Sequence, residues 1–510
     1  MRRDPTPSPK PRWRCAPSLA ETVGLLVIAL TTFVVGFAPL FGGPGYEYAL
    51  ACGLILPGCV AVTAALTELN RDRLHRYSSA LGRGALVGMA ASVLAALTAG
   101  IHGLRVGFCS PTQGFTLFLL GPAAGALLAG VWGAVVGSLL KTVAGKKRIA
   151  FAIVLGLAAP VATIVISLLR FYTSPMIFAF DPFVGFFAGA LYDTVIGGLD
   201  RLLTYRVGSA ATLLAVWAAA RQLRVPGPGQ RWPRWRWRHW SNAALLLVGG
   251  LVSSTITLNG PRLGHYQTAK SIATTLGGQL QGERCEVLHS REMLVRDVAL
   301  LTRECDAHVR AIESFLGTQG PKHVRVYLFN GPDQKGWLMG AANTYIAKPW
   351  RNEIYLQAAG FPHPVLAHEL AHVIAGSFGR GPFKIAGDWG GWLPDPGRIE
   401  GIAVAAAPSD EADLTATEWA AAMLELRLLP SFDAVFGLGF LAQHSSTAYT
   451  VAGAFLQHLR EQLGPEVLQA WYGGQTLEQA TGVSLAVWEQ RFRAHLATIQ
   501  LAEAALNNAR

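Results

Sequence analysis

Two histidines and a glutamate within one short apolar stretch have the types and the spacing for metal chemistry. Residues 365–376 read VLAHELAHVIAG, which places His368, Glu369 and His372 in a His-Glu-x-x-His pattern. On a helix, positions i and i+4 share one face, so the two imidazoles can bind one cation. Glu369 lies beside the first imidazole and could take a proton from a water that the cation activates. The pattern therefore predicts a hydrolytic zinc centre.

Such a centre needs a third protein ligand and one open position. Glu400, in the segment IEGIA, follows His372 by 28 residues. A second helix carrying Glu400 could reach the histidines, because the small side chains of Gly401 and Ala403 would let that helix pack closely. We therefore expect His368, His372 and Glu400 to bind one Zn²⁺ ion.

The two motifs together, HELAH followed by EGIA, resemble the gluzincin metallopeptidases of the peptidase MA superfamily over about residues 320–500. In that family two His and a downstream Glu bind zinc, and the Glu of the motif is general base and acid. The resemblance implies these roles for His368, His372 and Glu400 as ligands and for Glu369 as the catalytic carboxylate. The chain is also similar to bacterial membrane proteins in which a multi-span region precedes such a domain.

The resemblance also gives meaning to positions outside the two motifs. Tyr449, within SSTAYTVAGAFLQHL, is the candidate hydrogen-bond donor to the oxyanion, with His444 as the alternative donor. The strand NEIYLQ (352–357) would be the edge strand that aligns an extended peptide. Some gluzincins carry an Asp four residues after the third ligand, which orients a ligand His, but Val404 stands at that position here. None of the nearby acids has the expected spacing: Asp388, Asp395, Asp410 and Glu411.

The composition indicates a membrane protein. Hydrophobic residues make up 51% of the 510 residues and charged residues only 15%, against about a quarter in a typical soluble domain. The basic excess lies in residues 1–259, where 23 Lys and Arg stand against 8 Asp and Glu, whereas residues 260–510 hold 20 and 24. We therefore divide the chain into a polytopic membrane domain, 1–259, and a second domain, 260–510.

Long apolar stretches predict how the first domain crosses the membrane. A run of about 20 apolar residues can span a bilayer as a helix, because a helix satisfies its own backbone hydrogen bonds. We expect about seven spans, near residues 21–41, 48–67, 84–104, 116–140, 149–169, 202–220 and 241–259.

The basic segments predict the orientation, because Lys and Arg are enriched in cytoplasmic loops. Seven spans place every strongly basic segment in the cytoplasm, whereas an eighth span at 176–198 would move six Arg residues outside. We therefore expect an integral protein of the inner cell membrane, with a cytoplasmic amino terminus and residues 260–510 in the periplasm or extracellular space. The basic segments are residues 2–14, 71–83, 141–148 and 221–240.

The basic segments also bear on which molecules the protein binds. Residues 231–240 combine Trp with Arg, a composition that marks a membrane interface beside a span. We expect a lipid bilayer and a peptide or protein substrate as partners, and no nucleic acid.

Residues 171–193 would form an outside loop or a re-entrant element. They include the stretch DPFVGFFAGALYD (181–193). Asp181, Asp193 and Asp200 could mark a transport or gating path, since acidic residues near a membrane are often functional. Asp181 and Asp193 fit an outside loop, which is the interpretation we prefer.

Residues 260–510 contain no stretch of span length and indicate a mixed soluble domain. Strand patterns at 323–330 and 352–357 precede most of the helical patterns, which predicts an α+β class. Cys285 and Cys305 are candidates for a disulfide in an oxidising compartment. The helical patterns cover 293–317, 363–379, 397–407, 416–428, 449–463 and 485–500.

The predicted fold is therefore an α-helical polytopic membrane domain followed by an α+β zincin-like metallopeptidase domain. The predicted function is that of a membrane-anchored zinc metallopeptidase, in which Glu369 activates water to hydrolyse peptide bonds outside the cytoplasm. One alternative is a catalytically weak zincin-like binding module on a membrane scaffold, which Val404 favours. Another is an intramembrane metalloprotease, which the short, His-containing motif segment disfavours.

Overall fold

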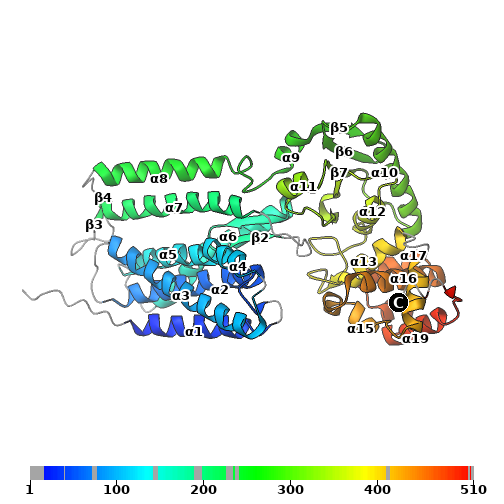
Figure 1. Ribbon diagram of the computed structural model, residues 1–510, viewed down its shortest axis with the longest axis horizontal. Helices are drawn as coiled ribbons and strands as arrows, with labels where there is room; N and C mark the ends of the chain where they lie inside the picture. Colours follow the sequence, from blue (N-terminus) through cyan, green and yellow to red (C-terminus); the bar gives the residue numbers. More distant parts are fainter. Residues whose placement is uncertain are drawn as a thin grey trace, which may run out of the picture. The chain divides into compact units, whose positions relative to one another are not determined.

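The computed structural model separates into two compact units (Figure 1). The first comprises Met1–Tyr172, Met176–Gly189 and Val195–Gln267, and the second comprises Thr173–Pro175, Ala190–Thr194 and Thr268–Arg510. The structure describes residues 17–38, 41–71, 77–108, 110–141, 147–188, 198–224, 234–235, 240–408, 414–503 and 506. Asp193, Asp410, Glu411 and the basic residues at 2–14, 72–76, 142–146, 225–233 and 236–239 lie outside this set.

Long apolar helices dominate the first unit. Six helices of the described chain are long and apolar enough to cross a membrane, one of them the segment Pro111–Leu140, in which α4, η2 and α5 follow one another with a kink at Gly121. These six helices match six of the seven predicted spans in position, length and composition. The remaining one, α1, has 17 residues and reaches about 26 Å, less than a hydrocarbon core of about 30 Å. The helices are α1 (Leu19–Val35), α2 (Tyr46–Leu69), α3 (Tyr77–Val106), α4 (Pro111–Phe118), η2 (Leu119–Ala123), α5 (Ala124–Leu140), α6 (Arg148–Thr173), α7 (Leu199–Gln222) and α8 (Trp240–Leu258).

Glycines let α5 lie directly against α2 and α3. A Cβ atom added to Gly130 would lie 2.0 Å from the carbonyl oxygen of Gly84, and one added to Gly133 would lie 2.1 Å from that of Ala61. Helices in lipid associate through such close backbone contacts, because apolar side chains gain little by leaving lipid for protein. The small residues of α5 therefore set the position of this helix between its neighbours.

A β-hairpin is buried among these helices. Its strands, β1 (Phe178–Asp181) and β2 (Gly185–Ala188), pair antiparallel, and the backbone N–H of Ala188 donates to the Tyr46 hydroxyl on α2 (2.7 Å). A Cβ atom on Gly125 of α5 would lie 1.7 Å from the carbonyl oxygen of Phe183.

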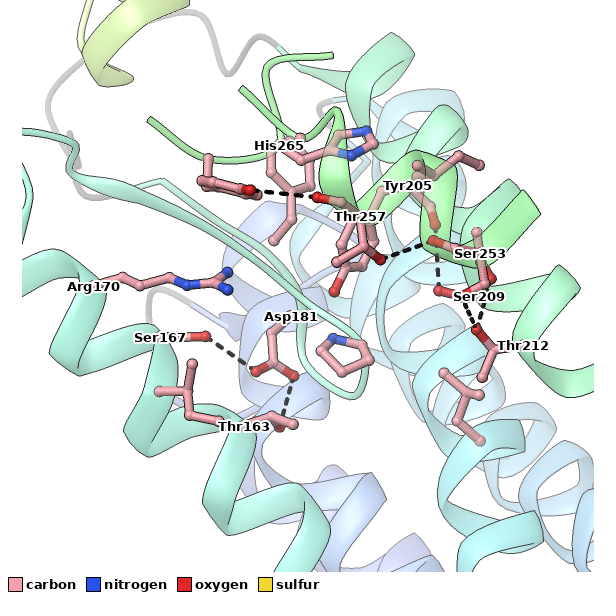
Figure 2. Close-up of a pocket in the computed structure, with 18 residues that line it drawn as sticks. Thr163, Ser167, Arg170, Asp181, Tyr205, Ser209, Thr212, Ser253, Thr257 and His265 are labelled. Atoms are coloured by element: carbon pink, nitrogen blue, oxygen red, sulfur yellow. Dashed lines mark hydrogen bonds between the residues drawn. The ribbon is translucent and has the colours of Figure 1, made fainter. Parts of the chain in front are cut away.

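The hairpin corrects the expectation of an outside loop. Asp181, at the turn of the hairpin (Figure 2), is only 4% exposed. The other interpretation of residues 171–193 is a re-entrant element. Residues 171–188, which the structure describes, agree with that interpretation. The physical cause is the turn: Asp181 accepts the backbone N–H groups of Phe183 and Val184, and Gly185 takes a φ of +103° that suits glycine.

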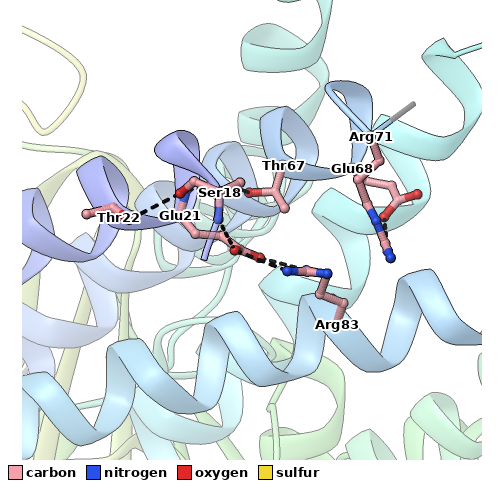
Figure 3. Close-up of polar contacts among 7 residues, drawn as sticks. All are labelled: Ser18, Glu21, Thr22, Thr67, Glu68, Arg71 and Arg83. Atoms are coloured by element: carbon pink, nitrogen blue, oxygen red, sulfur yellow. Dashed lines mark hydrogen bonds and ion pairs between the residues drawn. The ribbon is translucent and has the colours of Figure 1, made fainter. Parts of the chain in front are cut away.

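Ion pairs join the helices at one end of this unit (Figure 3). Glu21, in the first turn of α1, is buried and pairs with Arg83 of α3 (2.8 Å). Glu68, at the end of α2, pairs with Lys141 after α5 (2.8 Å) and with Arg71 (3.4 Å). Some of the basic residues that predict a cytoplasmic surface therefore neutralise buried carboxylates there.

A five-stranded mixed sheet organises the first half of the second unit. The strand order is β5-β6-β7-β9-β8, with β6, β7 and β9 parallel and the two outer strands antiparallel to their neighbours. The predicted strand 352–357 is present as β9, but the prediction that it forms the edge is wrong, because β8 pairs along its free side. The strands are β5 (Gly277–Gln281), β6 (Cys285–Ser290), β7 (Val324–Phe329), β8 (Ile346–Lys348) and β9 (Glu353–Gln357).

Helices follow and surround this sheet, so the second unit has the mixed α and β composition expected. A disulfide joins Cys285 of β6 to Cys305 of α10, as the sequence suggested. One continuous hydrophobic core includes residues of β6, β7, β9, α10, α12, α13 and α16. The helices are α9 (Ala269–Leu276), α10 (Val295–Leu316), α11 (Pro332–Met339), α12 (Leu366–Ala375), α13 (Pro396–Ala406), α14 (Ala416–Glu425), α15 (Phe432–Val435), α16 (Ser445–Leu463), α17 (Pro465–Tyr472), α18 (Leu477–Thr481) and α19 (Leu485–Leu496), with 3₁₀ turns η3 (Pro349–Arg351) and η4 (Leu438–Ala442).

Candidate metal site

Helix α12 presents its two histidines on one face because another face lies in the hydrophobic core. Leu366, Leu370 and Ile374 are fully buried, and their spacing of four residues places them along one side of the helix. The helix packs against α10 and α13. His368 and His372 lie together on the side that meets α13.

Three donor atoms from α12 and α13 converge. The Nε2 atoms of His368 and His372 are 3.2 Å apart. One carboxylate oxygen of Glu400 lies 3.3 Å from the first of these nitrogens and 3.4 Å from the second. Within the described residues, these three side chains form the one His, Cys, Asp and Glu group whose ligand atoms are close enough to share a metal ion. The predicted ligand set is therefore brought together.

The spacing of these atoms can be compared with a tetrahedral zinc site. Metal–ligand bonds of about 2.0–2.1 Å in a tetrahedron place the ligand atoms about 3.3 Å from one another. The three separations, 3.2, 3.3 and 3.4 Å, match that edge length. Two imidazoles and a carboxylate are also a donor set that catalytic zinc sites use. The same distances permit hydrogen bonds, so the residues fit a zinc ion without requiring one.

The pKa values of the two glutamates, Glu369 and Glu400, are shifted in opposite directions. The pKa of Glu369 is raised to about 7, chiefly by burial, with the charge of Glu400 also raising it while His368 and Lys335 oppose the shift. For Glu400, burial also acts to raise the pKa, but the two histidines outweigh it and hold the pKa well below its usual range. Glu400 is therefore an anion suited to bind a cation, and Glu369 is a carboxylate that can exchange a proton near neutral pH.

Tyr449, the predicted oxyanion donor, also lies beside the cluster. Its ring is nearly parallel to that of His368, at 6.3 Å between centroids and 19° between planes. The ring also packs against Phe440 of η4. The alternative donor, His444, is exposed at the start of α16, where its Nδ1 shares a hydrogen bond with Ser446. The structure therefore places Tyr449 next to a candidate ligand.

Val404 does not face the ligands. Its side chain packs against α16, where a Cβ atom on Gly453 would lie 2.2 Å from Val404 Cγ1. Gly401 likewise approaches Ala452 of α16, so it brings α13 close to α16 and not to α12 as the sequence suggested. His372 Nδ1 is buried and has no hydrogen-bond partner among the residues that the structure describes. The usual support of a ligand imidazole by a hydrogen-bond acceptor is therefore missing at this nitrogen.

A buried ion pair fixes the start of α13, two residues before Glu400. Asp395 caps the helix by accepting the backbone N–H of Arg398 (3.2 Å) and binds the Arg398 guanidinium (2.6 Å). The same carboxylate accepts the backbone N–H of Gly437 (2.9 Å). Asp388 completes the cluster at 3.1 Å from Arg398. Both acids therefore position α13. For Asp395, the Asp-Pro sequence at the start of the helix could have indicated this capping role.

Lys335 is a second residue that the sequence did not single out. It lies on α11, is fully buried, and donates to the carbonyl oxygen of Thr344 (2.7 Å). Its positive charge acts to lower the pKa of Glu369. The sequence around Lys335 does not indicate this role. Lys335 comes close to Glu369 only through the tertiary fold, because α11 follows β7 in the chain and Glu369 lies on α12.

The cluster lies outside the predicted membrane spans. Helix α12 has ten residues, and none of the six helices of span length contains His368, His372 or Glu400. Comparison with protein-family models, with curated proteins and with solved structures finds no match to this chain. The site must therefore be interpreted from its own residues.

Proposed function

We propose that this chain is a membrane-anchored zinc metallopeptidase of the gluzincin type that hydrolyses peptide bonds on the extracytoplasmic side of the inner membrane. The observation that carries the proposal is the convergence of His368, His372 and Glu400 at separations of 3.2–3.4 Å. Glu369 lies on α12 beside the two histidines and is 5% exposed. A metal ligand set beside a buried acid–base group is the minimum that water-mediated hydrolysis requires.

Each residue has a distinct task in this proposal. His368, His372 and Glu400 would hold a zinc ion, which when bound would act as a Lewis acid toward the scissile carbonyl and the attacking water. Glu369 takes the proton of the attacking water and later delivers it to the leaving amine. Tyr449 donates a hydrogen bond to the carbonyl oxygen as that oxygen gains negative charge.

The edge strand suggests the form of the substrate. Strand β8 pairs with β9 on one side and is the last strand of the described sheet. An extended peptide can add to such an edge through backbone hydrogen bonds. Unfolded or extended segments would therefore be preferred over compact domains. This task passes from β9, where the sequence suggested it, to β8.

Two features support the extracytoplasmic location. The Cys285–Cys305 disulfide is typical of proteins outside the reducing cytoplasm. The basic ends of the membrane helices, including Arg83 and Lys141, lie at the end that the charge rule assigns to the cytoplasm. If α1 also crosses the membrane, the number of spans is odd and the second unit lies on the side opposite the amino terminus.

A binding module without catalysis is the second candidate. The buried, unpartnered Nδ1 of His372 favours it, because ligand imidazoles that lack such support bind metal about 10–100-fold more weakly. A weakly loaded site would bind extended peptides at β8 and hydrolyse few of them. Zinc content without hydrolysis would identify this candidate.

The test uses the full-length protein, purified in detergent, with zinc content and hydrolysis of an unstructured peptide measured on the same samples. Wild type should contain stoichiometric zinc and hydrolyse the peptide. Glu369→Gln should keep its zinc and lose about 10²–10⁴-fold in kcat. Glu400→Ala should lose both zinc and activity.

A matched control distinguishes these effects from a general loss of negative charge. Glu466 is exposed at the start of α17, so Glu466→Gln should change neither zinc content nor hydrolysis. Full activity in Glu369→Gln would overturn the assignment of the base. Zinc retained at wild-type affinity in Glu400→Ala would overturn the ligand set.

A further inference from the structure

A cavity with several polar side chains in its wall lies within the membrane unit (Figure 2), and none of the candidate metal ligands lines it. It has a volume of about 320 Å³, large enough for the headgroup region of a lipid or for a small organic ion. Its walls come from α6, α7, α8, the β1–β2 hairpin and the segment 260–266. The sequence stretch that begins at Asp181 thus forms part of a built cavity.

The floor of the cavity is rigid. The Asp181 carboxylate accepts two backbone N–H groups of its own turn, and the hydroxyls of Thr163 (3.3 Å) and Ser167 (3.2 Å) on α6 also bind it. Behind the hairpin, the buried guanidinium of Arg206 donates to the carbonyl oxygens of Pro182 (2.7 Å) and Gly121 (3.0 Å). Asp181 is therefore committed to holding the hairpin, and four donors already bind its charge.

Arg170 is the group in the cavity wall with unused capacity. It lies in the last turn of α6, and Figure 2 shows its side chain extending into the cavity. The guanidinium lies over the Tyr266 ring, 5.0 Å from the centroid, and forms no ion pair with any described acid. Five guanidinium donors suit an oxyanion such as phosphate. The charged side chains that line the cavity are Arg170 and Asp181. Because four donors already bind the Asp181 carboxylate, Arg170 is the charge that remains to attract an anion.

The surroundings of the cavity indicate that the anion carries an apolar tail. On α6 no residue after Pro160 is buried, and on α8 none after Gly249 is buried. Apolar side chains such as Val165 and Leu169 of α6 and Leu251 of α8 are exposed there. In a membrane these surfaces contact acyl chains, and an Arg near a helix end lies at headgroup depth.

We infer that the cavity binds a phospholipid, with the phosphate on Arg170 and the acyl chains along the exposed halves of α6 and α8. The wall opposite Arg170 carries Ser209, Thr212 and Ser253 (Figure 2), whose hydroxyls can hydrogen-bond to polar headgroup atoms. This site does not depend on the metallopeptidase proposal. It assigns to the membrane unit a function beyond anchoring, namely specific lipid binding.

The test measures lipid retained by the full-length protein in detergent, by native mass spectrometry after titration with dioleoylphosphatidylethanolamine. Arg170→Gln should weaken phospholipid binding about tenfold, as expected for the loss of a charge-assisted contact. Arg170 is exposed and lacks an acidic partner, so this change should leave the fold intact. Asp181→Asn, in contrast, could disturb the hairpin and is not used.

Arg105 provides a matched control. It also lies in the last turn of a helix, α3, and its guanidinium is also 5.0 Å from an aromatic centroid, that of Phe37. Arg105 is not part of the cavity wall, so Arg105→Gln should change lipid binding less than twofold. Equal losses in the two variants, or no loss in Arg170→Gln, would overturn the site.

Two further probes distinguish the source of the anion. Dioleoylglycerol has the same tails without a phosphate, and it should bind at least tenfold more weakly than the phospholipid. Inorganic phosphate lacks tails and should not displace the bound lipid at millimolar concentration. Binding of the diacylglycerol as tight as that of the phospholipid, or displacement by inorganic phosphate, would overturn the inference.

Discussion

At the residue scale, the parallel rings of Tyr449 and His368 allow a separation of catalysis from binding. A hydroxyl that binds only the developing oxyanion stabilises the transition state and not the bound substrate. Tyr449→Phe should therefore lower kcat about 10²–10³-fold with little change in KM. Zinc content should stay at the wild-type level, since Tyr449 is not a ligand. Steady-state kinetics on an unstructured peptide give the result, and a rise in KM at unchanged kcat would assign Tyr449 to substrate binding.

The resemblance to gluzincins would suggest that an Asp at position 404 improves the site, but the structure predicts the opposite. An Asp at this position would restore the residue type found in some gluzincins, but the side chain here points at Gly453 of α16. Val404→Asp should therefore bury an unpaired charge between α13 and α16 and destabilise the protein by several kcal/mol. Thermal unfolding in detergent measures this, with Val404→Ala as the control for lost packing.

Zinc affinity completes the test of Val404. Because the new carboxylate would not reach a ligand imidazole, Val404→Asp should bind zinc no more tightly than wild type. Tighter zinc binding with unchanged thermal stability would show that the side chain at this position does face the ligands.

At the element scale, the cap of α13 links stability to the metal site. Asp395 is 5% exposed and binds both the backbone and the guanidinium of Arg398. Asp395→Ala would remove the buried acidic partner of Arg398 and leave the guanidinium with the more exposed Asp388, which should cost about 3 kcal/mol, and would free the turn that carries Glu400. Thermal stability and zinc affinity should both fall. The same change at Asp433, exposed in the first turn of α15, should affect neither, and equal effects at both positions would contradict the role of the cap.

A buried lysine in the edge strand β8, Lys348, makes the stability of the fold depend on pH. Burial lowers the pKa of Lys348 from 10.5 to about 7. Above pH 7 the folded state holds this lysine neutral while the unfolded state still binds a proton, so raising the pH toward 10 favours folding. The apparent Tm in detergent should therefore rise between pH 7 and pH 9, and Lys348→Met should reduce that rise.

Lys322, which is exposed, supplies the control for the Lys348 prediction. Lys322→Met should keep the wild-type dependence of Tm on pH. If Lys348→Met kept the same dependence as well, groups other than Lys348 would be responsible for it.

The elements that sequence reasoning missed share a physical cause. Helix α10 buries mainly one side, so its helical period is visible in the sequence. In the β1–β2 hairpin Phe178, Phe180 and Phe186 are buried, and so is Ala179 between the first two, so no alternation marks the strands. Strand β8 has three residues, too few for any period.

Some residues of the candidate site could be predicted from the sequence and others could not. His368, Glu369 and His372 lie on one helix, so their spacing alone determines their relation. Glu400 could be proposed less directly, from the small residues that follow it and from the resemblance, because 28 residues separate it from His372 and the path between them is not fixed by local rules. The Asp395–Arg398 pair and Lys335 depend on contacts between elements, which one sequence does not reveal.

At the scale of the whole molecule, the function depends on which side of the membrane holds the second unit. Six helices of span length and α1 together cross the membrane an odd number of times only if α1 also crosses. With 17 residues α1 must be accommodated by local thinning of the bilayer or by its flanking residues. If α1 did not cross, the amino terminus and the second unit would share one side, so the orientation test also decides the role of α1.

Labelling of introduced cysteines by a membrane-impermeant maleimide measures this orientation in intact spheroplasts. The free cysteines would first be replaced by Ser, with Cys285 and Cys305 retained in their disulfide. Ser446→Cys, exposed in the second unit, should react in intact spheroplasts. Lys147→Cys, exposed before α6, should react only after permeabilisation, because its loop is predicted to be cytoplasmic. The reverse pattern would place the metal cluster in the cytoplasm and contradict an extracytoplasmic peptidase, whereas the lipid cavity would remain testable in either orientation.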